Sequence, residues 1–464
     1  MTDGGTRVAK DSLGEIQVPV DAYYGAQTER AKHNFPISGL HLPRRFIRAQ
    51  GIIKLCAARA NRDVGELDKK IADAIIQAAH EVIDGKFDDQ FVVDVYQAGA
   101  GTSQNMNANE VIASRAAELL GGAIGDVSLV HPNDHVNMAQ STNDTIHVAM
   151  NIAAMEGIHH DLLPAIKRLE VALQDKAQEF DPIVKSGRTH LQDAVPIRLG
   201  QEFGGYAQAI STRRQQVERT AKSLLAIGLG GNAVGTGINA HPDYSHTAIR
   251  QIAEFTGLPF VPPENYFTFV QNPEAAVEVS GTLRALAITV NKIANDLRLL
   301  SSGPRTGLAE IRLPAVQPGS SIMPGKVNPV MAEMINMICY QVIGFDGCIA
   351  SAGGASQLEL NVMMPVMAYN LLQAIHILAN GLTAFTDKCV VGLEADESRC
   401  RHYAEMSTSL ATSLNPEIGY DKAAEIAKEA YRTGKSVRQV AQETGLAEAT
   451  LNELLDIRKL TGDR

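Results

Sequence analysis

The stretch "LRALAITVNKIANDLRLL", from Leu283 to Leu300, decides the fold class. Its large aliphatic residues recur at alternating spacings of three and four, at Leu283, Leu286, Val290, Ile293, Leu297 and Leu300. This spacing places them on one face of an α-helix, as in the seam of a coiled coil. Polar residues such as Arg284, Asn291, Asn295 and Arg298 fall off that face. Because a seam of this kind needs a partner helix, the sequence predicts a bundle of long helices.

Helical patterns continue on both sides of this stretch. We expect helices over 46–83 with a break near Gly65, in a run that ends at Leu120, along the stripe 163–180, and over 330–350 and 362–389. The last two segments are apolar on more than one side, which is typical of helices buried in a bundle. Residues 1–43 are rich in Gly, Pro and polar residues and are expected to form an extended arm, and a smaller helical piece is expected from about Glu394. The predicted fold class is therefore all-α.

Composition narrows the classes of function. The 464-residue chain has 45% hydrophobic residues, 5% aromatic residues and no Trp. Its net charge of −10 argues against a nucleic-acid partner. The five cysteines are odd in number and form no C-x-x-C, so neither a disulfide framework nor a structural metal site is expected. The N-terminus has no apolar core of a signal peptide, and 330–350 contains Glu333 and Asp346, which is too polar for a membrane span. We expect a cytoplasmic protein with no membrane partner.

Three motifs imitate ligand sites. "GTGINA" (235–240) fits a dinucleotide loop, but no β-branched strand precedes it, so a tight turn is expected. His131 and His135 are spaced like helical metal ligands, but Pro132 interrupts them and no further ligands follow. A hydrogen-bonded loop is the prediction there, with an anion contact as the alternative. Residues 436–455 resemble a helix-turn-helix whose second helix carries acidic residues and no Lys or Arg, so a small packed subdomain is expected instead of a DNA reader.

Four polar loops interrupt the helical patterns. They read "GAGTSQNMN" (99–107), "QSTND" (140–144), "SGRTHLQD" (186–193) and "GSSIMPGKVN" (319–328). Each is rich in hydroxyl and amide groups, and two add Lys326 or His190. In any one loop these residues could simply cap the following helix. Four such loops in one chain favour a site for a carboxylate, because hydroxyl and amide donors around a cation are what a carboxylate needs.

"GSSIMPGKVNP" (319–329) closely resembles the most specific motif of the aspartase/fumarase superfamily. "GRTHLQDAVP", "NMNANEVI", "AVGTG" and "GYDKAAEIAKEA" are also similar to it, over nearly the whole chain. The resemblance implies a three-part all-α lyase fold with a long central bundle, divided here into 1–140, 141–394 with a mobile loop 317–329, and 395–464. It also implies a homotetramer in which each active site draws on three subunits.

The superfamily resemblance implies reversible β-elimination from a succinate derivative to give fumarate, with no cofactor and no metal. A weakly acidic C–H proton is removed, and the neighbouring carboxylate becomes a doubly charged aci form held by fixed donors. Ser320 resembles the catalytic base. It must be ionised, so backbone N–H groups and a cation are needed beside it, and Gly319 and Gly325 permit the required loop closure.

The other roles are carried over from the same resemblance. Lys326 and Asn328 would bind the second carboxylate of a small dicarboxylate substrate. His190 would be catalytic with Glu333 orienting it, and "HPND" resembles a secondary anion site at His131, Asn133 and Asp134. The aci-carboxylate would be cradled by Thr102, Ser141, Thr142 and Ser321, and the leaving group would be held by Asn143, Thr189 and His190.

The leaving group is ambiguous in the sequence. "GAGT" (99–102) and "STND" (141–144) resemble aspartate ammonia-lyases, whereas fumarate hydratases have G-S-G-T and S-S-N-D. "GLGGNAVGTG" (228–237), "GGAS" (353–356) and "HPND" resemble class II fumarate hydratases. Groups that touch the substrate discriminate most strongly, so aspartate is the expected substrate and malate the alternative. "TIHVAMN" (145–151) departs from both patterns.

Two hypotheses from other classes stay open. The chain could be a non-catalytic structural relative, as lens crystallins are of a sister lyase, although it keeps Ser320, Lys326, His190 and Glu333. It could also bind DNA through 436–455, which a salt-dependent gel shift would reveal.

Overall fold

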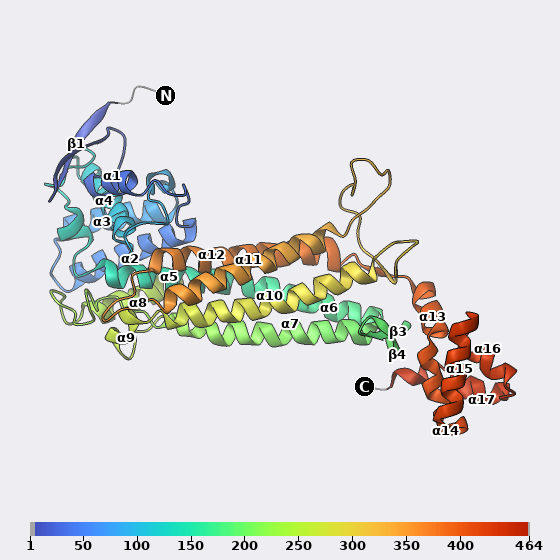
Figure 1. The fold of residues 1–464 in the computed structure, drawn as a ribbon. Helices are drawn as coiled ribbons and strands as arrows, with labels where there is room; N and C mark the ends of the chain where they lie inside the picture. The colour runs from blue at the N-terminus through green and yellow to red at the C-terminus, as the bar shows by residue number, and fades with distance from the viewer. Residues whose placement is uncertain (1–4, 463–464) are drawn as a thin grey trace. The chain divides into compact units, whose positions relative to one another are not determined.

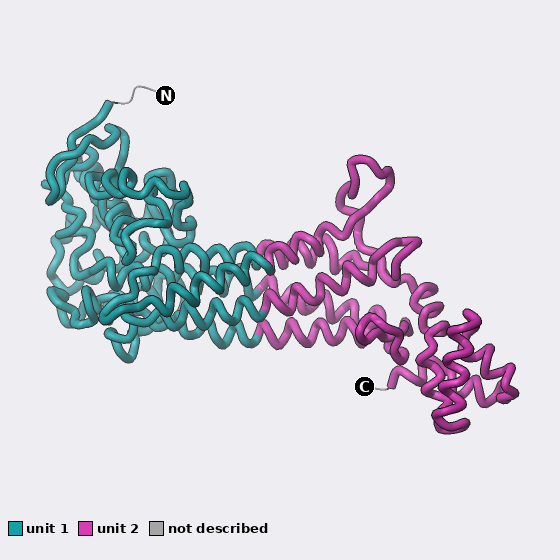
Figure 2. Tube along the Cα trace, in the orientation of Figure 1, with its two compact units in different colours: residues 1–163, 215–285, 340–378 teal, residues 164–214, 286–339, 379–464 magenta. Residues whose placement is uncertain are grey.

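The computed structural model describes residues 5–462, which divide into two compact units (Figures 1 and 2). Unit 1 comprises residues 1–163, 215–285 and 340–378, and unit 2 comprises 164–214, 286–339 and 379–464. Each unit is therefore assembled from three separate stretches of chain. The two units are described one at a time.

Unit 1 is a helical layer structure with one β-hairpin. Its elements are β1 (Thr6–Asp11), β2 (Gly14–Pro19), α1 (Ala26–Asn34), α2 (Arg44–Asp63), α3 (Lys69–Ile83), η1 (Asp88–Gln90), α4 (Thr102–Leu119), η2 (Pro132–Val136), α5 (Thr142–Gly157), η3 (Ile158–Leu162), η4 (Lys222–Leu225), α8 (Tyr244–Thr256) and α9 (Tyr266–Gln271). Helix α2 packs against α3, α5 and α8 and is the centre of this layer. The predicted break between α2 and α3 is confirmed, with Gly65 at φ +83° in the connection.

The expected extended arm over 1–43 is only partly correct. Strands β1 and β2 pair as an antiparallel hairpin from Thr6↔Pro19 to Asp11↔Gly14, and α1 follows. The hairpin was not foreseen because its strands have only six residues each and almost no buried face: among their residues only Val18 is buried.

Four long helices contribute residues to both units: α7 (Leu199–Ala221), α10 (Glu274–Leu300), α11 (Val330–Gly353) and α12 (Met364–Phe385). Helix α6 (Leu163–Glu179) belongs almost wholly to unit 2. The predicted seam on α10 is confirmed: every one of its six aliphatic residues is at most 5% exposed. Burying a large aliphatic side chain contributes about 1.5–3 kcal/mol, so this face holds the helix in its bundle.

Helix α11 leaves part of its apolar surface uncovered in one chain. Met337 is 64% exposed and Tyr340 is 55% exposed, and neighbouring α10 exposes Ile288 at 53%. Within residues 5–462, α11 is the one helix long and apolar enough, by length and composition alone, to cross a membrane, with 33% of that window buried. A core helix of a globular protein meets the same criteria, so no membrane assignment follows.

Unit 2 adds two small antiparallel pairs and a C-terminal helical cluster. Its further elements are β3 (Val184–Thr189), β4 (Gln192–Arg198), β5 (Ile311–Arg312), η5 (Thr386–Val390), β6 (Glu394–Ala395), α13 (Glu397–Met406), η6 (Thr408–Leu414), α14 (Asn415–Ile418), α15 (Tyr420–Thr433), α16 (Val437–Glu443), α17 (Glu448–Leu454) and η7 (Lys459–Thr461). Strand β3 pairs with β4, and β5 pairs with β6. Within residues 5–462, these two pairs and the β1–β2 hairpin are the only paired strands, so the predicted all-α fold class is confirmed.

The helix-turn-helix-like segment lies in a packed subdomain with its own core. Leu410, Leu414, Ile426, Val440 and Leu451 belong to one buried cluster. Helix α16 begins with a capping box: Ser436 Oγ accepts from the Gln439 N–H, and Gln439 Oε1 accepts from the Ser436 N–H. This arrangement fits the predicted packed subdomain.

Candidate active site

The loop that carries Ser320 is closed on itself by one backbone hydrogen bond and one from a side chain. The Gly319 N–H donates to Lys326 O at 2.8 Å, and Asn328 Nδ2 donates to Gly319 O at 2.7 Å. Gly325 has φ +78°, in the region that favours glycine, as the closure predicted from the sequence requires. Met323, Lys326 and the residues between them are exposed, so the loop projects its side chains into solvent.

The Ser320 hydroxyl lies where an oxyanion would be stabilised. Its Oγ accepts the backbone N–H groups of Ile322, at 3.2 Å, and Met323, at 2.9 Å. Hydrogen bonds donated to a charged form favour that form, so these two donors favour the alkoxide of Ser320 over the neutral hydroxyl. The backbone donors that the sequence required for a serine base are therefore present.

Gly319 has no room for a side chain. A Cβ at this position would lie 2.7 Å from Lys326 O and 2.8 Å from the Asn328 nitrogen, both backbone atoms. Gly319→Ala is expected to open the loop and to lower kcat by about 10²-fold, because a misplacement of about 1 Å costs this much. The free energy of unfolding should change little, since the loop is exposed.

Steady-state kinetics and urea unfolding check this prediction. Gly205→Ala is the matched control, because its Cβ would meet no atom within 4 Å and should leave kcat unchanged. A Gly319→Ala enzyme with wild-type kcat would show that the closed loop geometry does not matter.

Thr189 and His190 lie at the tip of the β3–β4 hairpin. Thr189 pairs with Gln192, so His190 and Leu191 form a two-residue turn, with φ +55° and +58°. Positive φ at both central residues is the geometry of a type I′ turn, which a histidine and a leucine adopt only at a cost in strain. Both side chains are exposed, Leu191 at 71%. The strained turn thus presents His190 outward from its own chain.

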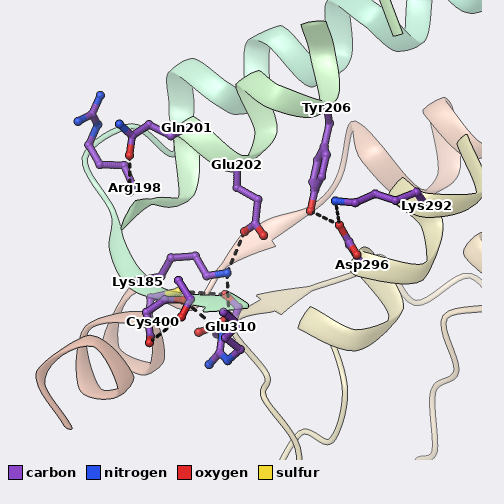
Figure 3. Close-up of polar contacts among 12 residues, drawn as sticks. Lys185, Arg198, Gln201, Glu202, Tyr206, Lys292, Asp296, Glu310 and Cys400 are labelled. Carbon is purple, nitrogen blue, oxygen red and sulfur yellow. Dashed lines mark hydrogen bonds and ion pairs between the residues drawn. The ribbon is translucent and has the colours of Figure 1, made fainter. Parts of the chain in front are cut away.

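The stem of this hairpin is anchored by a buried charge network (Figure 3). Lys185 Nζ lies 2.8 Å from Glu202 Oε2 and 3.3 Å from Glu310 Oε2, and Arg188 Nη1 lies 2.9 Å from the same Glu310 oxygen. Glu310 is fully buried, and its backbone oxygen accepts from the Asp396 N–H and the Cys400 thiol. Burial raises the pKa of the Cys400 thiol to about 12, so it stays protonated. The network therefore ties the hairpin, the segment before the Ser320 loop and α13 together.

Glu333 lies in the first turn of α11 and is partly buried. Within one chain, no hydrogen bond joins Glu333 to His190 in the described residues. Its predicted role in orienting His190 stays a prediction.

A second group of candidate residues lies in unit 1, at the N-termini of α4 and α5. Thr102 is the first residue of α4 after Gly101, and Thr142 is the first residue of α5 after Ser141. The two helix ends are neighbours, because Asn105 Nδ2 donates to Thr142 Oγ1 at 3.2 Å and a Cβ on Gly101 would touch Ile146. Unpaired N–H groups and the helix dipoles make such ends favourable for an anion. Thr102, Ser141 and Thr142 are at least partly exposed there.

Asp144 fixes this end of α5. Its Oδ1 accepts the Ser141 N–H, and its Oδ2 accepts the N–H groups of Gly230 and Asn232 at 2.9 and 2.8 Å. Burial raises the pKa of Asp144 to about 6, against the lowering effect of these backbone donors. The loop 228–240 is thereby attached to α5, and "GTGINA" is a run of turns as predicted. Asn143 also bonds this loop, through Nδ2 to Ala233 O, and its Oδ1 accepts no hydrogen bond within the described residues.

The "HPND" residues form the N-terminal part of the five-residue π-helix η2, with His131 as its N-cap, so the expected hydrogen bonds are present but the segment is not a loop. The Asp134 N–H donates to His131 Nδ1 at 3.1 Å, and the His131 N–H donates to His135 Nδ1 at 3.0 Å. His131 and Asn133 also line a cavity of about 510 Å³ together with Arg7 and Lys10. Asp11 and Glu110 line the same cavity, and Arg7 donates to Ala22 O and Tyr24 O, so the predicted secondary anion site stays a prediction.

The predicted site residues thus fall into two groups. Unit 1 holds Thr102, Ser141 and Thr142 at the N-termini of α4 and α5, which we call the cradle. Unit 2 holds the Ser320 loop, the His190 hairpin and Glu333. Sequence reasoning missed Glu310 and Lys54. Lys54 is a buried lysine that donates to the Asn105 amide, which in turn donates to Thr142. The signal for Lys54 was available: it is a single charge inside the apolar run "GIIKLCAA" of 51–58.

Comparison with known proteins gives the family. A family model described as "Lyase" matches residues 14–344, and one described as "Fumarase C C-terminus" matches 410–462. The chain belongs to the aspartase/fumarase superfamily. It is 54% identical to a class II fumarate hydratase of Halobacterium salinarum, over 98% of this chain and 97% of that protein. It is 50% identical to an aspartate ammonia-lyase of Bacillus subtilis, over 98% and 96%.

A solved structure agrees with this assignment. The crystal structure of a class II fumarase from Schistosoma mansoni matches with a TM-score of 0.95 and 37% identity, over 98% of this chain and 99% of that one. The superfamily predicted from "GSSIMPGKVNP" is therefore confirmed, and the chain is a lyase. Its relatives divide between carbon–oxygen and carbon–nitrogen lyases.

Proposed function

We propose that this lyase converts L-aspartate reversibly to fumarate and ammonia. The observation that carries the proposal is the cradle at the N-termini of α4 and α5, where "GAGT" supplies Ala100 and "STND" supplies Thr142. A site without a hydroxyl at position 100 has one donor fewer for a hydroxyl leaving group. A site that lacks one polar partner rejects a hydroxyl group by up to about 10²-fold, which is enough to favour the amine as the leaving group.

In the proposed reaction Ser320 removes the proton at C3 of aspartate. The carboxylate next to that carbon gains charge as the carbanion forms, and the helix N-termini and the hydroxyls of Thr102, Ser141 and Thr142 stabilise it. Lys326 and Asn328 bind the other carboxylate. His190, at the strained hairpin tip, holds the departing amine together with Thr189 and Asn143. No cofactor or metal takes part.

The active site is proposed to be shared between subunits of a homotetramer. The exposed His190 and Leu191, together with the exposed apolar residues of α10 and α11, support an assembly in which neighbouring copies cover these surfaces. A cytoplasmic location and the absence of membrane and nucleic-acid partners remain proposals from the sequence.

Fumarate hydratase is the second candidate, because the Halobacterium salinarum relative carries that name. One assay separates the two. Purified protein is incubated with fumarate, with and without ammonium, and the loss of fumarate absorbance is followed together with aspartate and malate. We expect aspartate to form only with ammonium. Malate without any aspartate would reject the proposal in favour of the hydratase.

A double variant tests the cradle directly. Ala100→Ser with Thr142→Ser restores the hydroxyl and removes the methyl group. It is expected to shift the ratio of malate to aspartate activity toward malate by at least about tenfold, since a polar group that touches the substrate discriminates by more than this. Ala123→Ser, on an exposed position after α4, is the control and should leave the ratio unchanged. An unchanged ratio in the double variant would show that specificity is set elsewhere.

A further inference from the structure

Lys54 is a buried cation surrounded by amide oxygens. It lies on α2, is 1% exposed, and donates to Asn105 Oδ1 at 2.9 Å, Gln140 Oε1 at 2.9 Å and Asn137 Oδ1 at 3.1 Å. No carboxylate among the described residues forms an ion pair with it. A buried charge without a paired carboxylate is costly, so this arrangement calls for a reason beyond packing.

One of these amides connects Lys54 to the candidate carboxylate cradle. Asn105 Oδ1 accepts a hydrogen bond from Lys54 Nζ, and Asn105 Nδ2 donates to Thr142 Oγ1 at 3.2 Å. Because Thr142 Oγ1 accepts this hydrogen bond, its own O–H is left to donate elsewhere. Thr142 lies at the exposed N-terminus of α5, so that donor is available to an anion there. Chains of hydrogen bonds polarise one another, and a charge at one end strengthens the donor at the other.

The electrostatic surroundings leave Lys54 able to change charge near neutral pH. Burial lowers its pKa to about 7, and the Asp144 carboxylate acts in the opposite direction. The buried or part-buried titratable groups on the elements around α2 include His80 and Glu81 on α3, Glu110 on α4, Asp144, His147 and Glu156 on α5, Tyr244 on α8 and His135 on η2. Of these, Asp144 is the one whose charge acts on Lys54.

We propose that Lys54 is a positioning residue that acts through Asn105 and Thr142 to strengthen binding of the substrate carboxylate at the N-termini of α4 and α5. This inference rests on the proposed function, because it assigns the cradle to a dicarboxylate. The protonated lysine adds a positive charge behind the hydroxyl donor. As the carboxylate gains charge toward the aci form, the same charge becomes more favourable.

The test measures binding of succinate, a dicarboxylate that cannot react, to the full-length protein by calorimetry. Lys54→Met keeps the length of the side chain and removes the charge. We expect its Kd for succinate to rise about tenfold, as one nearby charge at partial screening predicts. Its kcat should fall at least as much, since the carboxylate carries more charge in the transition state than in the substrate.

Two further variants separate this role from a structural one. Asn105→Asp keeps a partner for Lys54, but the new carboxylate offsets the positive charge of Lys54. The variant also removes the donor to Thr142, so it should weaken succinate binding in the same way. Lys176→Met is the matched control: Lys176 is 8% exposed, pairs with Glu179 and donates to Leu393 O, and none of its hydrogen bonds in the described residues reaches Asn105 or Thr142. Its Kd should equal that of the wild type.

The pH dependence gives a readout that packing would not change. An anion favours charged Lys54, so wild-type affinity should be highest below pH 7 and fall as the pH rises through about 7, where Lys54 loses its proton. This part of the profile should be flat in Lys54→Met. Wild-type affinity and an unaltered profile in Lys54→Met, or in Asn105→Asp, would overturn the inference. Absence of succinate binding by the wild type would instead refute the dicarboxylate site, and with it the proposed function.

Discussion

Ser320→Ala is expected to lower kcat by about 10²–10⁴-fold, the usual contribution of a positioned general base. In the wild type, the N–H groups of Ile322 and Met323 converge on Ser320 Oγ and favour its ionised form. Alanine leaves those donors in place but supplies no group that can accept the proton. KM should change much less than kcat, because Lys326 and Asn328 still bind the substrate.

The measurement is steady-state turnover together with urea unfolding. Ser320 is in a loop, and its side chain bonds only local backbone, so the free energy of unfolding should stay within about 0.5–1 kcal/mol of the wild type. Ser351→Ala is the control: Ser351 is exposed on α11, bonds only Gly347 O, and should leave both quantities unchanged. Near-normal turnover in Ser320→Ala would mean that another group removes the proton.

Glu310→Ala is expected to give the largest loss of stability, about 3–5 kcal/mol in the free energy of unfolding. Glu310 is fully buried and shares one oxygen between Lys185, itself 2% exposed, and Arg188. Removing the carboxylate leaves two cations near each other, with Glu202 as the remaining partner of Lys185. A buried charge that loses its partner costs more than the pair contributes, which is why the expected loss exceeds that of a surface pair.

Denaturant midpoints at one fixed protein concentration check this prediction, since the assembly also contributes to apparent stability. The control is Glu405→Ala, which breaks an exposed pair with Arg401 and should cost less than about 1 kcal/mol. Glu310→Gln keeps the shape and allows a measurement if the alanine variant fails to fold. Equal midpoints for Glu310→Gln and the wild type would show that the charge network does not hold this end of unit 2.

Much of the helical architecture was predictable because it depends on local periodicity. The α10 seam, the break at Gly65 and the run ending near Leu120 all follow from which residues recur on one helical face. The strand pairs were not predictable in the same way. The β3–β4 hairpin turns at His190 and Leu191, where no Asn-Gly or Asp-Gly marks a turn.

The motif of the Ser320 loop predicted the local features of the site but not its distant contacts. "GSSIMPGKVNP" gave the superfamily, the base and the need for backbone donors, and the structure supplies the two N–H groups. The motif could not indicate Glu310, ten residues earlier, whose partners Lys185 and Arg188 are more than 120 positions away in sequence.

By itself, the sequence determined the helical fold class, the superfamily and the identity of the polar loops, because periodicity and short motifs are properties of neighbouring residues. Only the tertiary structure decided that Glu310 joins Lys185 to Arg188 and that Lys54 reaches Thr142 through Asn105. These contacts join residues through burial and hydrogen-bond geometry. Both depend on how distant segments pack, and no local pattern specifies that packing.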